Sequence, residues 1–168
     1  MHFHNKIFNR MKYLVTLFVI LSIAASYDLN IFYCGFSGDY CGQSNIDDVY
    51  PSARFVILAF ANTLPSGGVV CDDDHFPAAL ATSWKKNGKK VLLSIGGQNG
   101  NWAYVFASEE SRMNFIDSVC KYISLYKLDG VDLDIELYLA TPRVVAQTII
   151  DLKAKLMKIG KKLLIVSP

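Results

Sequence analysis

Three acidic residues, Asp132, Asp134 and Glu136, stand at every second position of the chain. Alternate residues of a β-strand leave the same face, so a strand here would carry three carboxyl groups in a row, about 6–7 Å apart. Like charges at this range cannot all ionise freely, so one acid stays protonated while its neighbours are anionic. Glycoside hydrolysis uses such a set: a proton donor for the leaving oxygen, and an anion that stabilises the developing positive charge.

The same three residues are also compatible with an ordinary strand that has one solvated polar face. Their position favours chemistry, because they occupy the C-terminal half of a strand that we expect to be central in the sheet. Enzymes built on parallel barrels place their catalytic groups at that end of the strands.

Five apolar segments predict the strands around this row. Several are apolar on both faces, which is typical of parallel strands covered by helices. They are Asn30–Gly35, Arg54–Asn62, Lys90–Gly96, Leu128–Glu136 and Lys162–Ser167.

Helix signals separate the later strands. Residues 76–87 have Pro77 near their start, and apolar residues recur at helical spacing after Ser108. Thr141 and Pro142 begin a third helix, which ends at Gly160. The alternation predicts an α/β fold with a parallel sheet, either open and doubly wound or a (β/α) barrel. The dinucleotide-binding motif GxGxxG, which is typical of open sheets, does not follow the first strand, so the sequence gives no dinucleotide-binding reason to favour the open sheet.

Two segments resemble the signatures of one known family. Residues 129–136 (DGVDLDIE) match the DxxDxDxE pattern of glycoside hydrolase family 18, and residues 94–97 (SIGG) match its SxGG pattern. The two lie in the family's order, on successive predicted strands with one helix between them. The resemblance covers nearly everything after residue 26 and implies a (β/α)8 TIM-barrel fold.

The resemblance implies a role for each carboxyl group. Glu136 would be the general acid that protonates the glycosidic oxygen. Asp134 would orient the substrate's N-acetyl group, whose carbonyl oxygen attacks the anomeric carbon and gives an oxazolinium ion. Asp132 would lie deeper and share charge or a proton with Asp134. This is one of the substrate-assisted exceptions to the two-carboxylate scheme.

The resemblance also implies supporting residues. Ser94 would hydrogen-bond the inner carboxyl group, and Asp129 begins the longer signature. Gly96 and Gly97 would let the third strand approach its neighbours closely as it ends.

Three aromatic residues have two interpretations each. Tyr33 and Phe60 fall where the family places aromatics along the floor of the cleft, but an aromatic in a strand is often core. Trp102 would either stack on a sugar ring or cover a helix end.

The chain is shorter than the fold that it resembles. Eight-stranded barrels usually need about 250 residues, whereas residues 27–168 supply five predicted strands. The family's tyrosine on the sixth strand and its tryptophan on the eighth have no counterpart. We therefore expect the N-terminal part of a catalytic domain, either as a fragment or as a short paralogue.

The first 26 residues predict a secretory signal. Basic Lys6, Arg10 and Lys12 precede the apolar run Leu14–Ala25, and residues 24–26 (AAS) supply the small residues of a cleavage site. The run has twelve residues, against about 20 for a membrane-spanning helix. We therefore expect a secreted protein that has no membrane association after cleavage. The alternatives are a buried helix or a membrane anchor.

Composition limits the remaining partners. With 52% hydrophobic and 19% charged residues the chain is globular, and beyond residue 26 fourteen basic residues face fifteen acidic ones. Nothing in this balance indicates nucleic acid. The spacing of Cys and His suggests no metal, and the resemblance implies no cofactor. Four cysteines in an exported chain are compatible with two disulfides in three pairings: Cys34, Cys41, Cys71 and Cys120.

Three functions remain open at this point. The first is hydrolysis of β-1,4-linked N-acetylglucosamine polymers, that is chitin, with retention of configuration. The second is binding of chitin or glycans without turnover, as in chitinase-like lectins, although these generally lack the acid that Glu136 provides here. The third is cleavage of the chitobiose core of N-glycans.

Overall fold

The computed structural model describes residues 29–33, 49–72, 74–136, 140–160 and 162–167. The expected signal over residues 1–26 lies outside these ranges, as do Cys34 and Cys41. No helix within them is long and apolar enough to cross a membrane.

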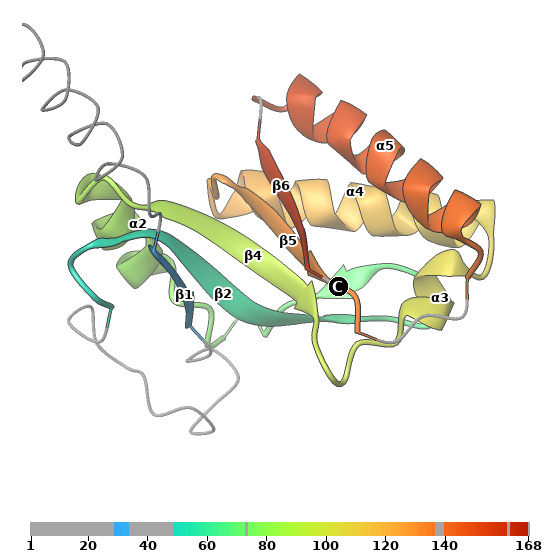
Figure 1. The fold of residues 1–168 in the computed structure, drawn as a ribbon, viewed down its shortest axis with the longest axis horizontal. Helices are drawn as coiled ribbons and strands as arrows, with labels where there is room; N and C mark the ends of the chain where they lie inside the picture. Colours follow the sequence, from blue (N-terminus) through green and yellow to red (C-terminus); the bar gives the residue numbers. More distant parts are fainter. Residues whose placement is uncertain (1–28, 34–48, 73, 137–139, 161, 168) are drawn as a thin grey trace, which may run out of the picture.

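Five parallel strands form one open sheet in chain order, as the apolar segments predict. They are β1 (Leu29–Tyr33), β2 (Ala53–Thr63), β4 (Lys90–Gly96), β5 (Gly130–Asp134) and β6 (Leu163–Ser167). A two-residue strand that the sequence does not predict, β3 (Val69–Val70), pairs antiparallel with the end of β2. The sheet is a partial α/β layer and does not close into a barrel (Figure 1).

Helices follow the strands and cover one face of the sheet (Figure 1). They are α2 (Ala78–Lys86), α3 (Trp102–Phe106), α4 (Glu109–Leu125) and α5 (Pro142–Lys158). The sequence predicts all of them except the five-residue α3. The Ser108 hydroxyl accepts a hydrogen bond from the Ser111 main-chain N–H at 3.0 Å, so it caps α4 as expected.

The hydrophobic core lies between this face and the helices. Alternate residues of β4 and β5 pack there, including Leu93, Val131 and Leu133, against Trp84 of α2 and Phe115 of α4. The other residues of β4 and β5 leave the opposite face and form the row that carries polar groups. Strand alternation thus separates a dry helix-covered side from a side that holds the candidate site.

One cysteine limits the disulfide pairings that the sequence leaves open. Cys120 of α4 is a buried free thiol, and its pKa is raised above the ordinary value, chiefly by desolvation. Every pairing of four cysteines into two bridges uses Cys120. A framework of two disulfides is therefore not formed.

Candidate active site

The carboxyl groups of β5 become more exposed toward the end of the strand. Asp132 is fully buried with 0% exposure, Asp134 is half-buried, and Glu136, two residues beyond the end of the strand, is exposed. Because parallel strands end at the same edge, Glu136 lies at the C-terminal edge of the sheet. The row predicted from the sequence therefore runs from the interior to solvent.

The buried carboxyl group of Asp132 is hydrogen-bonded on both oxygens. The Ser94 hydroxyl donates to Oδ2 at 2.6 Å, from the position directly opposite Asp132 in the ladder. The Ser167 hydroxyl of β6 donates to Oδ1 at 2.9 Å. Burying a carboxyl group is costly unless such partners are present. Ser94 thus lies where the family resemblance implies, whereas Ser167 was not foreseen.

Asp134 holds its proton more tightly than an ordinary aspartate. Its pKa is raised, first by partial burial and then by repulsion from the charges of Glu136 and Asp132. Both neighbouring carboxyl groups of the row therefore contribute to the raised pKa of Asp134.

Two glycines shape the turn that follows β4. Gly96 has φ +111°, and a Cβ there would lie 2.2 Å from the main-chain oxygen of Asp134. Gly97 has φ +67°, and its Cβ would meet the Phe60 ring at 3.0 Å. Both positions need glycine for backbone conformation and for space. The partly exposed Phe60 therefore lies at the same edge of the sheet as Asp134.

Tyr33 does not lie on the carboxylate side. It pairs with Leu58, which pairs with the core residue Leu93, and its ring packs edge-on against Trp84 of α2 at 4.9 Å. With 2% exposure, Tyr33 belongs to the helix-covered core. The expectation that it lines the cleft does not agree with this position, because strand alternation turns it to the other face.

Trp102 is also buried, with 1% exposure. Its ring centroid lies 5.8 Å from that of Phe106 and 5.6 Å from that of Phe115. Its indole Nε1–H donates to the main-chain oxygen of Asp134 at 3.0 Å. A ring so enclosed offers no face to a sugar, so the stacking role expected for Trp102 does not agree with the structure.

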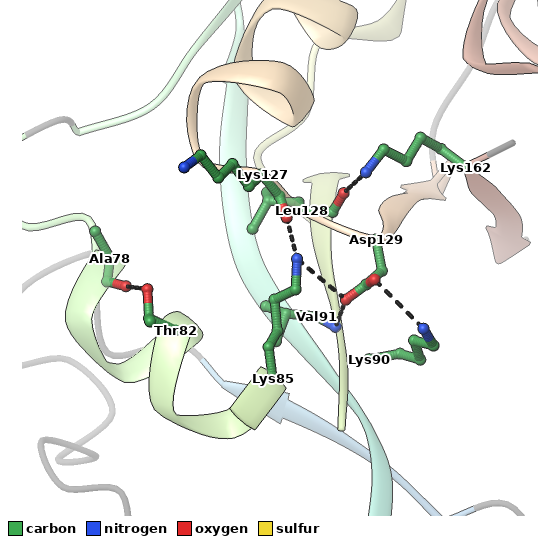
Figure 2. A network of polar contacts seen from close by, with 9 residues as sticks. All are labelled: Ala78, Thr82, Lys85, Lys90, Val91, Lys127, Leu128, Asp129 and Lys162. Atoms are coloured by element: carbon green, nitrogen blue, oxygen red, sulfur yellow. Dashed lines mark hydrogen bonds and ion pairs between the residues drawn. The ribbon is translucent and has the colours of Figure 1, made fainter. Parts of the chain in front are cut away.

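Asp129 lies at the other end of β5, away from the row of carboxyl groups. It accepts a hydrogen bond from the main-chain N–H of Val91 at 3.0 Å, and it pairs with Lys85 at 3.8 Å and Lys90 at 3.5 Å. Figure 2 shows this network and the bond from Lys85 to the Lys127 carbonyl. Asp129 therefore supports the N-terminal edge of the sheet.

Within the residues that the structure describes, no three His, Cys, Asp or Glu side chains gather into a group that could hold a metal ion. His75 lies on the surface and contacts Asp72, with 2.8 Å between Nδ1 and Oδ2.

Comparison with known proteins agrees with the family that the sequence resembles. Residues 31–167 match the sequence model of a family described as glycosyl hydrolases family 18. The chain belongs to glycosyl hydrolases family 18. Exochitinase 1 of Streptomyces olivaceoviridis is 36% identical over 109 residues, which cover 56% of this chain and 18% of that protein.

Solved family 18 structures share the fold. The group IV chitinase of Ostrinia furnacalis aligns over 84% of this chain and 43% of its own, with a TM-score of 0.72 and 20% identity. Its complex with allosamidin gives a TM-score of 0.71, also at 20% identity over 84% of this chain and 43% of its own. A putative chitinase A of Streptomyces coelicolor aligns over 84% of this chain and 50% of its own, with a TM-score of 0.66 and 28% identity. The chain thus spans half or less of these family 18 proteins.

Proposed function

We propose that the chain forms part of a secreted chitinase-type glycosidase that hydrolyses β-1,4-N-acetylglucosamine linkages. Glu136 donates the proton to the leaving oxygen. Asp134 holds the substrate's N-acetyl group, whose oxygen attacks the anomeric carbon with retention of configuration. Secretion rests on the basic, apolar and small-residue order of residues 1–26.

The observation that carries the proposal is the gradient of burial along the three carboxyl groups. A proton donor must reach the substrate, and Glu136 is the exposed member of the row. Asp134 stands between it and the buried Asp132, with a raised pKa that favours the protonated form. A carboxyl group beside the exposed acid can hydrogen-bond the substrate's N-acetyl group and orient it.

Asp132 fits a supporting role in this scheme. Its two hydroxyl partners occupy both carboxyl oxygens and fix its orientation beneath Asp134. Asp132 is fully buried and would act on the substrate only through Asp134, by sharing charge or a proton. Phe60, at the same edge, is the aromatic whose place still suits the floor of a cleft.

Glu136→Gln in the full chain tests the proposal. We expect the turnover of a fluorogenic chitotriose glycoside to fall at least about 100-fold, the usual contribution of general acid catalysis. Binding of chitooligosaccharide, measured by calorimetry, should persist because the glutamine keeps the shape of the side chain. Glu110→Gln, an exposed glutamate of α4, is the matched control and should retain full turnover.

The same assay separates the alternatives. If the turnover of Glu136→Gln stays within tenfold of the parent's turnover, Glu136 is not the general acid. Binding without turnover in the parent would favour the glycan-binding function, and cleavage of N-glycans in place of chitin would favour the chitobiose-core function. Efficient cleavage of fully deacetylated chitosan would contradict the attack by the N-acetyl group.

A further inference from the structure

The buried indole of Trp102 has one polar atom, and that atom contacts the end of β5. Trp102 begins α3, and its ring is packed against Phe106 of the same helix and Phe115 of α4. From this enclosed position Nε1–H donates to the main-chain oxygen of Asp134 at 3.0 Å. A buried Trp N–H usually needs a partner, and here the partner is the peptide group that joins the candidate site residue Asp134 to Ile135.

Neighbouring bonds hold the same peptide group on both sides. The Asp134 oxygen also accepts the main-chain N–H of Gly97 at 3.1 Å, and the N–H of Ile135 donates to the Ser167 oxygen at 2.9 Å. Because a peptide unit is planar, fixing its oxygen and its N–H fixes the plane. This unit joins Asp134 to Ile135, so the Asp134 side chain leaves the backbone at one end of it and Glu136 follows one residue beyond the other end.

Gly96 provides the space for the indole bond. A Cβ at Gly96 would lie 2.8 Å from Trp102 Nε1 and 2.2 Å from the Asp134 oxygen, so any larger residue would separate the two atoms. The glycine of the SxGG segment on β4 thus leaves room for Trp102 to contact β5, the strand that carries the DxxDxDxE segment. This contact explains why a tryptophan from outside both signatures is buried at their junction.

We propose that Trp102 is a positioning residue, whose indole N–H holds the main-chain oxygen of Asp134 and so sets the direction in which Asp134 and Glu136 leave the end of β5. The inference rests on the proposed function, since it assigns a task to the same carboxyl groups. Displacement of reacting groups by about 1 Å can cost about 100-fold in rate. Loss of this bond should therefore affect turnover more than substrate affinity.

Trp102→Phe in the full chain removes the donor and keeps an aromatic ring in the core. We expect kcat on the chitotriose glycoside to fall roughly 10- to 100-fold while KM changes less than threefold. The pKa of Asp134, followed by carboxyl ¹³C NMR, should move because the distances to neighbouring charges change. Phe115→Leu is the matched control: it loosens the packing against the same indole but leaves the hydrogen bond, so kcat and the titration should remain.

A second replacement covers the case in which Trp102→Phe does not fold. Benzothienylalanine at position 102 has the shape of tryptophan with sulfur in place of the N–H, and it should reproduce the fall in kcat and the titration shift.

Unchanged kcat and unchanged Asp134 titration in both replacements would overturn the inference. A parent without turnover would count against the proposed function alone, because the titration still decides whether Trp102 positions Asp134.

Discussion

Removal of the Asp129 carboxyl group should weaken the sheet from its N-terminal edge. The main-chain N–H of Val91 donates to this carboxyl group at 3.0 Å, and Val91 is fully buried. Asp129→Ala leaves that N–H without its acceptor, which costs about 1–3 kcal/mol. The ion pairs with Lys85 and Lys90 are partly exposed, with 31% and 56% of the lysine side chains accessible, and add about 0–1 kcal/mol each.

The expected loss in the free energy of unfolding is therefore about 1–5 kcal/mol for Asp129→Ala. Asp129→Asn keeps an oxygen that can accept from Val91 and removes only the charge. It should cost about 0–2 kcal/mol, and 1 M salt should reduce the difference between parent and Asn variant, because ions screen exposed pairs.

Urea unfolding followed by tryptophan fluorescence measures both variants. Asp117→Ala is the matched control, since its ion pair with Lys155 is exposed on the helical surface, and it should cost less than about 1 kcal/mol. If the Ala variant loses no more than this control, the bond to Val91 contributes nothing. If the Asn variant loses as much as the Ala variant, the charge dominates and the hydrogen-bond argument is wrong.

Two further predictions concern the other end of the strands. Gly96→Ala should destabilise by about 3 kcal/mol or more, since it combines positive φ with a backbone clash, whereas Gly88→Ala, with φ +79° and open space, should cost about 1–2 kcal/mol; thermal unfolding compares them. In Glu136→Gln the pKa of Asp134 should fall, because the charge of Glu136 is one cause of its rise. A carboxyl group whose pKa is raised in the folded state stabilises the fold below its unfolded-state pKa, and this stabilisation is lost as pH rises through the folded-state pKa. The loss of stability should therefore be smaller in Glu136→Gln. Carboxyl ¹³C NMR measures the pKa of Asp134, and unfolding at several pH values measures the stability.

Apolar runs predicted where the strands lie. They did not predict the shortest elements or which face of each strand the helices cover. Five segments gave the five parallel strands, whereas β3 has two residues and α3 has five, too few to show a period. Tyr33 was placed on the wrong side because its segment is apolar on both faces. Only the pairing with Leu58 reveals which face the helices cover.

Within the site, the residue pattern predicted the residues that share a strand, whereas contacts between strands either followed from the family resemblance or were missed. Asp132 and Asp134 follow from a period of two, and Ser94 follows from the family resemblance. Ser167 reaches Asp132 from 35 positions away, and its only signal was a hydroxyl residue at the end of an apolar strand. Trp102 was noticed, but its neighbours Phe106 and Phe115, which enclose it, follow from helix packing that no local pattern contains.

The longer signature divides according to the end of β5 at which each acid lies. Asp129 precedes the strand and binds lysines and a main-chain N–H, which are interactions of stability. Asp132 and Asp134 follow toward the edge where parallel-barrel enzymes place chemistry. The register of β4 against β5 connects the two ends, because it sets Ser94 opposite Asp132 and Gly96 opposite Asp134. If Asp129→Ala lowers the free energy of unfolding but leaves the titration of Asp134 unchanged, the two ends of β5 act separately.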